Sequence, residues 1–411
     1  MATVQRPGAG QIVNRFIVVG AGPAGLSLSL QLARGGADVS LVEGRSDFAR
    51  NLRGDALMPS GLDALARMGL WQHLMALPQR RLQGWQVWLE GRRLFHVDEP
   101  MGSLQSCRLV RQQDLLESLL AQAMALPGFH WRPGELVRGL LEEQGRITGV
   151  RLSGGEALRA DLVIACDGRD SGLRQAAGIE LRREGPPLEM LWLQLPDMAG
   201  TDPTLGQFLT LVGGGAIASA CLGAGGELQL GWLLRPAEPT PRRSASAWAE
   251  AIARLAPAGL AAVLRQQGHR LQKPQRLGVQ VGEARRWQRP GLLLLGDAAH
   301  PMSPVRAQGI NLALRDSLVA AGELLQVEPV ADGQARWHAL DQACQRVERA
   351  RRPEVRRLQT LQGAELRQGH WIGHNAALRH GLSLAAPVLG PVARQVWIAR
   401  QHPLREGTAW L

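Results

Sequence analysis

The sequence predicts an α/β fold in which a doubly wound parallel sheet is interrupted by an antiparallel sheet and followed by helices. Three observations support this. Residues 15–45, RFIVVGAGPAGLSLSLQLARGGADVSLVEGR, have the pattern of a buried strand, a glycine turn, a helix and a second strand. Residues 178–285 change to short, glycine-punctuated β segments, which are typical of antiparallel sheets. After another apolar run at 291–295, the chain is predicted to be largely helical.

The 411 residues exceed what one simple core usually holds, so two domains or a large insertion are expected. We expect a nucleotide-binding domain from residues 14–75, 105–178 and 285–330. A substrate domain is expected from residues 76–104 and 179–284, and a C-terminal helical segment from 331–411. Within these segments we predict hairpin turns at Glu90-Gly91 and Gln144-Gly145, one helix near 248–264, and a strand turn at 213–215 in place of a second nucleotide loop.

The composition argues against several classes of protein. No apolar stretch is long enough to span a membrane, and the first residues lack the apolar centre of a secretory signal. The four cysteines are far apart in the sequence, which argues against a disulfide framework and suits a reducing, cytoplasmic location. No metal site is expected, because the cysteines lack paired spacing and His73, His96 and His370 lack ligand spacing.

The formal net charge of +11 is unevenly distributed. Residues 334–411 hold twelve arginines against five acidic residues, and the cluster Arg346–Arg357 is predicted to be mostly the solvated face of a helix. The chain has no tyrosine and five phenylalanines, so the aromatic side chains that usually accompany a nucleic-acid surface are scarce. We therefore expect no nucleic-acid partner. Weak peripheral contact with an anionic membrane is compatible with this charge.

The glycine turn GAGPAG follows a predicted strand and opens a predicted helix, the context in which GxGxxG indicates a dinucleotide site. Gly20 permits the turn, Gly22 lets a pyrophosphate approach the backbone, and Gly25 lets the helix pack closely. Glu43, at the end of the second strand, is placed to accept from ribose hydroxyls. The residues assigned to this site are Gly20, Gly22, Pro23, Ala24, Gly25, Glu43, Gly44 and Arg45. The motif alone does not separate NAD from FAD.

Two further motifs distinguish an FAD site from an NAD site. Residues 161–174, DLVIACDGRDSGLR, and 292–316, LLLLGDAAHPMSPVRAQGINLALRD, each end a buried strand on an acid and a glycine. A simple NAD-binding domain does not need three strands that each end on an acidic residue or a glycine. In their order and spacing, from about residue 14 to 330, they resemble the class A flavoprotein monooxygenases, the para-hydroxybenzoate hydroxylase-like family. The resemblance implies a Rossmann-like FAD-binding domain of the glutathione reductase type with an inserted antiparallel substrate domain.

The resemblance also implies roles for single residues. Asp297, after Gly296, would bond the ribityl chain of FAD, and Pro304 would pack near the flavin. The backbone of 309–311 would face the N1/O2 edge, where a helix N-terminus stabilises negative charge. Asp167 would support the cofactor, while Arg53 and Gln112 match positions near the pyrophosphate and ribityl groups, with Arg111 as a competitor. The FAD-site residues implied here are Arg53, Gln112, Asp167, Gly296, Asp297, Pro304, Gly309, Ile310 and Asn311.

One position departs from the family pattern. The flavin loop often contains PxGGQG, whereas Arg306 replaces a glycine in PVRAQG here. Two interpretations stay open: Arg306 points to solvent, or it adds positive charge beside the flavin or an acidic substrate group. His300 is expected to be structural or to border the flavin.

The implied function is an FAD-dependent monooxygenase that uses NADH or NADPH and O2, through a flavin C4a-hydroperoxide, on an aromatic or lipophilic small molecule. No side chain need act as a nucleophile, so the catalytic residues are unknown. The absence of tyrosine removes the phenol relay of some relatives and favours a larger quinone-like or polyketide-like substrate. Some of Trp85, Trp88, Trp192 and Trp232 could line its pocket. The expected oligomeric state is a monomer or a homodimer.

Three other functions are compatible with parts of the sequence. A prenyl-chain reductase shares the fold but tends to lose the proline loop. A flavin-dependent halogenase usually carries a Trp-x-Trp-x-Ile-Pro signature, which this sequence lacks. A non-catalytic flavoprotein could dock through its basic C-terminal segment.

Overall fold

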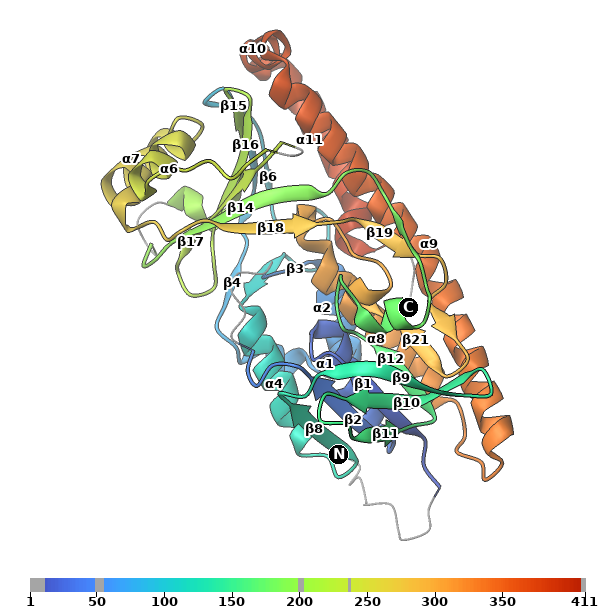
Figure 1. Ribbon diagram of the computed structural model, residues 1–411. Coiled ribbons are helices and arrows are strands. Elements are labelled where there is room, and N and C mark those ends of the chain that lie inside the picture. The colour runs from blue at the N-terminus through green and yellow to red at the C-terminus, as the bar shows by residue number, and fades with distance from the viewer. Residues whose placement is uncertain (1–11, 49–54, 199–202, 236–237, 408–411) are drawn as a thin grey trace.

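The computed structural model describes residues 12–48, 55–198, 203–235 and 238–407. Its two main β-sheets lie one above the other in Figure 1, and a long C-terminal helix runs along the side of both. This arrangement confirms the predicted fold class, a Rossmann-like domain with a second, antiparallel sheet and C-terminal helices. The predicted domain boundaries themselves stay a prediction.

The lower sheet has six strands in the order β20-β21-β12-β1-β2-β8. Neighbours from β21 to β8 are parallel, while the edge strand β20 is antiparallel to β21. The strands are β1 (Arg15–Val19), β2 (Asp38–Glu43), β8 (Phe129–Pro133), β12 (Leu162–Ala165), β20 (Gln288–Arg289) and β21 (Leu292–Leu294). Strand β8 was not predicted; its five-residue segment FHWRP pairs with β2 at the edge of the sheet.

The two faces of this sheet are covered differently. Phe16 and Val18 of β1 pack towards the helices α1 (Pro23–Arg34), α4 (Gln112–Met124) and α8 (Gln308–Leu325). Ile17 and Val19, which alternate with them, pack on the other face with residues of the small sheet β11-β10-β9. Those strands are β9 (Val137–Glu143), β10 (Arg146–Leu152) and β11 (Ala157–Arg159). Burial on both faces explains the continuous apolar run of β1.

The upper sheet has seven strands in the order β18-β14-β17-β16-β15-β5-β6. All neighbours are antiparallel except β5 and β15, whose parallel pairing joins two segments that are far apart in the sequence. The strands are β5 (Gly84–Leu89), β6 (Arg92–Asp98), β14 (Leu188–Leu195), β15 (Phe208–Gly213), β16 (Ala216–Leu222), β17 (Leu228–Leu233) and β18 (Gln275–Val279). The predicted turn at Glu90-Gly91 is confirmed, with φ of 50° and 73°.

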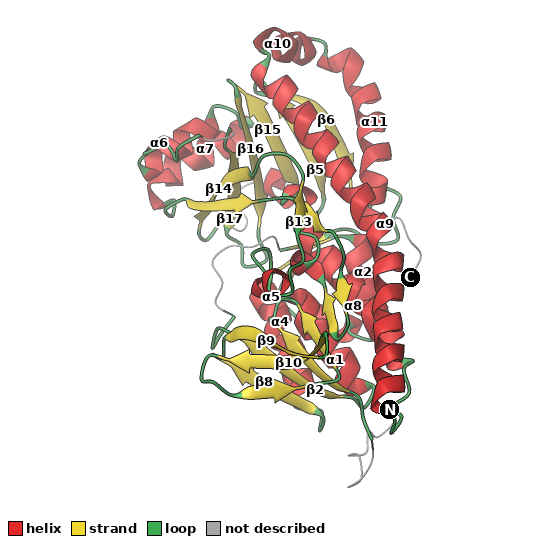
Figure 2. Cartoon of the chain, turned by 45° about the vertical axis from the view of Figure 1, so that its right-hand side comes forward, coloured by secondary structure: helices red, strands yellow, loops and turns green. Residues whose placement is uncertain are grey.

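The prediction of one helix near 248–264 was wrong. Two helices, α6 (Ala245–Ala253) and α7 (Ala258–Gln267), pack on the upper sheet instead (Figure 2). Pro257 lies at the N-cap of α7, and a proline cannot donate the backbone hydrogen bond that a continuous helix would need.

Three helices follow: α9 (Gly333–His374), α10 (Ala376–Leu384) and α11 (Ala386–Glu406). Helix α9 contacts both α8 below and β16 above, so it bridges the two sheets, and α11 packs beside it (Figure 2). The remaining elements are β3 (Ala56–Leu57), α2 (Pro59–Arg67), α3 (Trp71–Met75), β4 (Gln79–Arg81), β7 (Arg108–Val110), α5 (Gly172–Ala176), β13 (Leu181–Arg183) and β19 (Gly282–Ala284), with short 3-10 turns at Pro203–Gly206, Gly268–Arg270, Gly296–Ala298 and Val305–Ala307.

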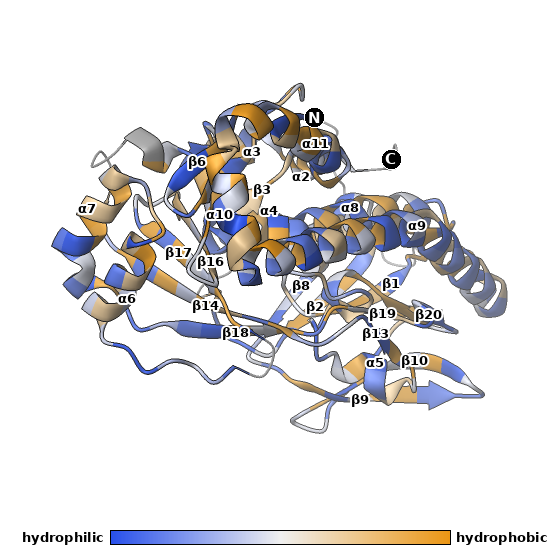
Figure 3. Cartoon of the chain, turned by 90° about the horizontal axis from the view of Figure 1, so that it is seen from above, coloured by the Kyte–Doolittle hydropathy of each residue, from blue (hydrophilic) through white to orange (hydrophobic). Residues whose placement is uncertain are grey.

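Polar and apolar residues interleave along α9, as Figure 3 shows by hydropathy. Among the described residues, no single helix has the length and apolar character needed to cross a bilayer. The bent pair α10 and α11, with 101° between its members, meets that test by length and composition alone.

Candidate active site

A cavity of about 960 Å³ lies between the two sheets, bordered by the carboxyl ends of β1, β2 and β12 and by the upper sheet. Most predicted site residues line it: Gly20, Gly22, Pro23, Ala24, Glu43, Gly44, Arg45, Gln112, Asp167, Asp297, Pro304, Gly309 and Ile310. Gly25, Gly296 and Asn311 lie behind the wall, and Arg53 lies outside the described residues. The glycine turn and the start of α8 therefore border one and the same cavity.

The glycine turn is packed too tightly for side chains. Gly20 has φ of +100°, and a Cβ on it would lie 2.3 Å from the Cys166 carbonyl oxygen. A Cβ on Gly25 would lie 1.9 Å from the Gly20 carbonyl oxygen. Gly22 is the N-cap of α1 and Pro23 its first residue, so the helix N-terminus opens at the cavity. This geometry suits a phosphate group at the backbone.

Glu43 borders the cavity and also holds the glycine turn. Its Oε2 accepts from the Ala21 backbone N–H at 2.8 Å, and its Oε1 accepts from the Arg45 backbone N–H at 3.1 Å. Because each carboxylate oxygen can accept more than one hydrogen bond, these contacts leave room for the predicted ribose interaction.

The loop after β21 brings a second acid to the cavity. Asp297 lines it, and its Oδ2 accepts from Arg169 Nε at 3.2 Å. Helix α8 begins at Gln308, so the backbone of Gly309 and Ile310 borders the cavity at a helix N-terminus. A partial positive charge is therefore presented there without a cationic side chain.

Asn311 holds the start of α8 in place through its side chain. Its side chain is fully buried and ties α8 to the segment around β3. Its Oδ1 accepts from the Met58 N–H at 2.8 Å, and its Nδ2 donates to the Ala56 and Ala307 carbonyl oxygens at 3.1 and 2.8 Å. The Asn311 side chain thus positions the wall of the cavity, and the role predicted for its backbone stays a prediction.

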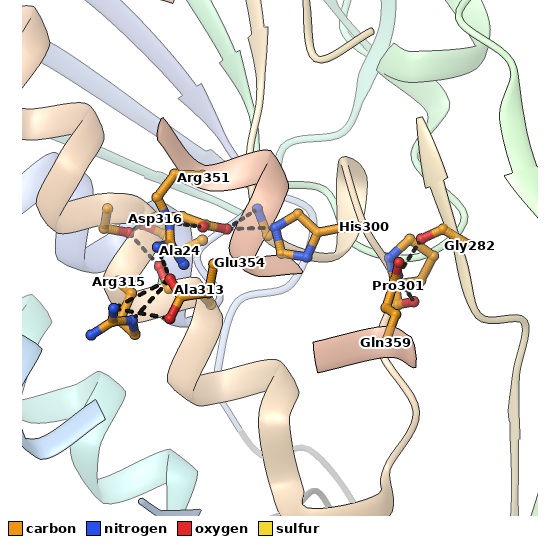
Figure 4. Close-up of polar contacts among 12 residues, drawn as sticks. Ala24, Gly282, His300, Pro301, Ala313, Arg315, Asp316, Arg351, Glu354 and Gln359 are labelled. Atoms are coloured by element: carbon orange, nitrogen blue, oxygen red, sulfur yellow. Dashed lines mark hydrogen bonds and ion pairs between the residues drawn. The ribbon is translucent and has the colours of Figure 1, made fainter. Parts of the chain in front are cut away.

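Buried charges support the loop from behind (Figure 4). His300 Nε2 lies 2.6 Å from Asp316 Oδ2, and Arg351 Nε donates to Asp316 Oδ1 at 2.8 Å. Arg351 also pairs with Glu354, which in turn pairs with Arg315. Burial opposes ionisation of Asp316, but His300 and Arg351 outweigh it and lower the Asp316 pKa. His300 is therefore a structural residue.

Arg306 does not point to solvent, so that interpretation was wrong. Its side chain is 8% exposed, and its guanidinium lies 5.2 Å from the ring of Trp85 and 5.1 Å from that of Trp397. Its Nε donates to Glu365 Oε1 at 2.9 Å. Arg306 does line the cavity, but Glu365 balances its charge. Its influence on a flavin or substrate stays a prediction.

Several cavity residues were not predicted. Glu365, Leu366 and Gly369 of α9 line the wall, because the helix reaches the cavity from a segment that was expected to be a tail. Arg169 and Asp55 also line it. Arg169 stands inside the motif DLVIACDGRDSGLR, and Asp55 lies two residues after Arg53, which was assigned to the cofactor site.

The four tryptophans named as candidates for the substrate pocket lie in two different places. Trp85 and Trp192 line the cavity, while Trp88 and Trp232 pack against the core beneath α6 and α7.

Three buried polar atoms at the cavity have no hydrogen-bond partner among the described residues: Asp167 Oδ1, Gln112 Oε1 and Trp192 Nε1. Buried polar atoms in native proteins are nearly always satisfied, so such a group indicates a missing ligand or solvent partner. Asp167 and Gln112, together with the tight glycine turn and the α8 N-terminus, fit an extended dinucleotide, whereas Trp192 belongs to the upper sheet.

Comparisons with known proteins agree with this geometry. A family model described as an FAD binding domain matches residues 15–357. The 6-methylpretetramide 4-monooxygenase of Streptomyces rimosus is 35% identical over 365 residues, covering 87% of this chain and 84% of the relative. The chain is a class A flavoprotein monooxygenase. This FAD-dependent oxidoreductase therefore has the cofactor and the reaction class predicted from its motifs.

Two further proteins resemble this monooxygenase. The 3-demethoxyubiquinol 3-hydroxylase of Escherichia coli K12 is 29% identical over 334 residues, covering 74% of this chain and 77% of the relative. The crystal structure of PqsL of P. aeruginosa in complex with 2-aminobenzoylacetate aligns with a TM-score of 0.73 at 19% identity, covering 90% of this chain and 99% of that one. The curated relatives favour the monooxygenase over the reductase and halogenase alternatives, and the structural match supports the fold.

Proposed function

We propose that this monooxygenase hydroxylates a multi-ring, hydroxylated aromatic molecule of the quinone or polyketide type. The observation that carries the proposal is the single cavity that continues from the glycine turn to an apolar wall on the upper sheet. That wall includes Trp85, Leu188, Met190, Trp192 and Phe208. The names of two relatives, a pretetramide monooxygenase and a demethoxyubiquinol hydroxylase, point to substrates of this kind.

The proposed reaction converts an aromatic C–H, O2, NAD(P)H and a proton into C–OH, water and NAD(P)⁺. FAD, when bound, supplies the electron transfer and the activation of oxygen. The residues that would hold it are those that line the cavity from the glycine turn to Gly309, with Arg53 retained from the sequence prediction.

The protein contributes position and environment. The start of α1 faces the phosphate end, and the start of α8 offers its partial positive charge where a reduced ring would carry negative charge. The apolar wall excludes water from the reacting carbon, which limits wasteful loss of activated oxygen.

The purified protein is expected to be yellow and to oxidise NADH or NADPH slowly until a suitable substrate is added. Polycyclic phenols, anthrones and hydroquinones would be screened with both reductants, and products analysed by mass spectrometry under ¹⁸O2. One ¹⁸O atom in the product, with faster NAD(P)H oxidation, is the expected result. Reductant oxidation that yields peroxide and no labelled product across the whole panel would contradict the proposal.

We further propose a cytoplasmic enzyme, a monomer or homodimer in solution, that makes weak peripheral contact with anionic membranes. Residues 366–405 contain five arginines and no acidic residue. Exposed apolar side chains lie on the same helices: Trp371, Leu384, Val388, Val392 and Val396. Apolar side chains flanked by cations favour an anionic interface.

Val388→Asp combined with Val392→Asp is expected to weaken binding to phosphatidylserine vesicles by on the order of tenfold or more, because two apolar contacts are lost and two negative charges added. Vesicle co-sedimentation at low and high salt measures this. Met124→Asp, at an exposed apolar site on α4, is the control and should bind like the natural protein. Equal binding of all three proteins, or a change of oligomeric state in the double variant with no change in vesicle binding, would contradict membrane contact.

A further inference from the structure

The flavin loop, residues 304–309, has a backbone conformation that its residue types do not favour by themselves. Arg306 has φ of 60° and ψ of 24°, and Ala307 has φ of 50° and ψ of 35°. Both lie in the left-handed region, which disfavours residues with a Cβ and accepts glycine. Such conformations persist where the surrounding structure holds them in place. Contacts from outside the loop therefore have to stabilise it.

The side chain of Arg306 is enclosed by four residues. Its guanidinium lies 5.2 Å from the ring of Trp85 and 5.1 Å from that of Trp397. Its Nε donates to Glu365 Oε1 at 2.9 Å, and its Nη2 contacts the same oxygen. Glu365 Oε2 accepts in turn from Gln401 Nε2 at 3.2 Å. We call Arg306 and these four partners the arginine clamp, because a guanidinium held between two rings and a carboxylate has little freedom to move.

Backbone carbonyl groups of the loop are also held by side chains. Gln362 Nε2 of α9 donates to the Val305 carbonyl oxygen. Gln308 Nε2 donates both to the Arg306 carbonyl oxygen at 2.9 Å and to the Leu404 carbonyl oxygen of α11 at 2.7 Å. Both glutamine side chains are buried. The loop is thus attached to α9 and α11 by its backbone as well as by Arg306.

Most of these partners come from the C-terminal helices α9 and α11, which lie side by side (Figure 2). The FAD-binding family model matches the chain only up to residue 357. Five partners follow that residue: Gln362, Glu365, Trp397, Gln401 and Leu404. At the position of Arg306 the family pattern often has a glycine, which needs no such support in the left-handed region. This chain therefore combines an arginine in the loop with C-terminal residues that hold it.

We propose that Arg306 is a positioning residue, which fixes the flavin loop against α9 and α11 and thereby fixes the α8 N-terminus beside the flavin ring. The loop runs directly into α8, which begins at Gln308. The partial positive charge of a helix N-terminus stabilises a reduced ring more than an oxidised ring, because the reduced ring carries negative charge. A loop released from its left-handed conformation would hold this charge less closely. The clamp therefore raises the reduction potential of bound FAD, whatever the substrate is.

The test measures the midpoint potential of the FAD-bound protein without substrate, by reduction against a dye of known potential. In the first variant, Trp397→Leu, no charge changes, and the described cavity wall includes Arg306 and Glu365 but not Trp397. The matched control is Arg400→Met. Arg400 is an exposed residue of α11 whose described hydrogen bond also joins α11 to α9, through Gln368 on the surface.

Glu365→Gln, the second variant, separates position from charge. Removing a negative charge from the cavity wall would by itself favour the more negative, reduced ring and raise the potential. Loss of the clamp would lower it. The sign of the change therefore tells the two effects apart.

Trp397→Leu and Glu365→Gln are each expected to weaken the binding of reduced FAD relative to oxidised FAD on the order of tenfold, which lowers the two-electron potential by about 30 mV. Trp397→Phe keeps an aromatic face for the guanidinium and should recover most of this loss. Arg400→Met should have the potential of the natural protein. All variants should still bind oxidised FAD, since the glycine turn lies at the other end of the cavity.

An unchanged potential in a folded, yellow Trp397→Leu protein would overturn the proposal. A raised potential in Glu365→Gln would do the same, since it would show that charge rather than position decides, and this variant keeps the test decisive if Trp397→Leu does not fold. No substrate enters these measurements. Failure of the proposed hydroxylation, seen as products without ¹⁸O, is therefore distinguishable from failure of the clamp.

Discussion

Gly25→Ala is expected to yield a protein that purifies nearly colourless. A Cβ at this position would lie 1.9 Å from the Gly20 carbonyl oxygen and 3.2 Å from Cys166 Cβ. Gly20 lies in the glycine turn, Cys166 directly follows β12, and both line the cavity, so relief of the clash has to move the backbone that would hold the FAD phosphates. Overpacking of this kind costs about 1–3 kcal/mol, and each 1.4 kcal/mol taken from cofactor binding lowers affinity about tenfold.

The matched control is Gly322→Ala. Gly322 also lies inside a helix, α8, but a Cβ there would meet no atom within 4 Å. Alanine in a helix is favoured over glycine by roughly 0.5–1 kcal/mol, so this variant should be yellow and equally or more stable. Flavin absorbance per protein and the melting temperature are the measurements. A Gly25→Ala protein with full flavin content would show that the close approach of helix and turn is not required.

These glycines illustrate what could be predicted from the sequence. The turn, the helix start and Glu43 form a local pattern within about thirty residues, and local geometry dictates which residue types fit. The loop at Gly296 and Asp297 and the start of α8 follow the same logic. Their convergence on one cavity was predicted through a family resemblance and is observed in the structure.

The unpredicted features depend on contacts between distant segments. Glu365 reaches the cavity because α9 crosses both sheets, and its partner Arg306 is 59 residues away in the sequence. Asp55 acquires its setting from Gln229, 174 residues further along the chain. Periodicity and spacing report on neighbours within one element, so they cannot identify which charge on one segment meets which charge on another.

Arg351 shows the same limit within a single helix. The cluster Arg346–Arg357 was expected to be mostly solvated, and Arg346, Arg349, Arg356 and Arg357 are indeed exposed. Arg351 is the exception, with 0% exposure between Asp316 and Glu354. A run of arginines in the sequence gives no sign that one of them completes a buried charge network.

Arg351→Met is expected to lower the free energy of unfolding by about 3–5 kcal/mol, because removing one partner leaves buried charges uncompensated. Asp316 and Glu354 would both lose their shared cation. Since Asp316 also accepts from the Gly296 N–H at 3.3 Å, the loop that bears Asp297 should lose support, and flavin should dissociate at lower denaturant concentration. Urea unfolding followed by tryptophan and flavin fluorescence measures both effects. Arg349→Met, an exposed arginine two residues earlier, should change stability by less than about 0.5 kcal/mol.

The pH dependence provides a further check on this variant. In the natural protein His300 and Arg351 lower the Asp316 pKa despite burial. The ionised Asp316 carboxylate therefore stabilises the folded state above about pH 4, the pKa of an aspartate in the unfolded chain, and this stabilisation is lost as the pH falls through the pKa of Asp316 in the folded protein. Without Arg351, burial dominates and the Asp316 pKa rises. The stability difference between the two proteins should therefore be largest near neutral pH and shrink in acid. If the difference in free energy of unfolding between the two proteins stays constant from pH 7 to pH 4, lost packing, rather than an unpaired carboxylate, accounts for the lower stability of the variant.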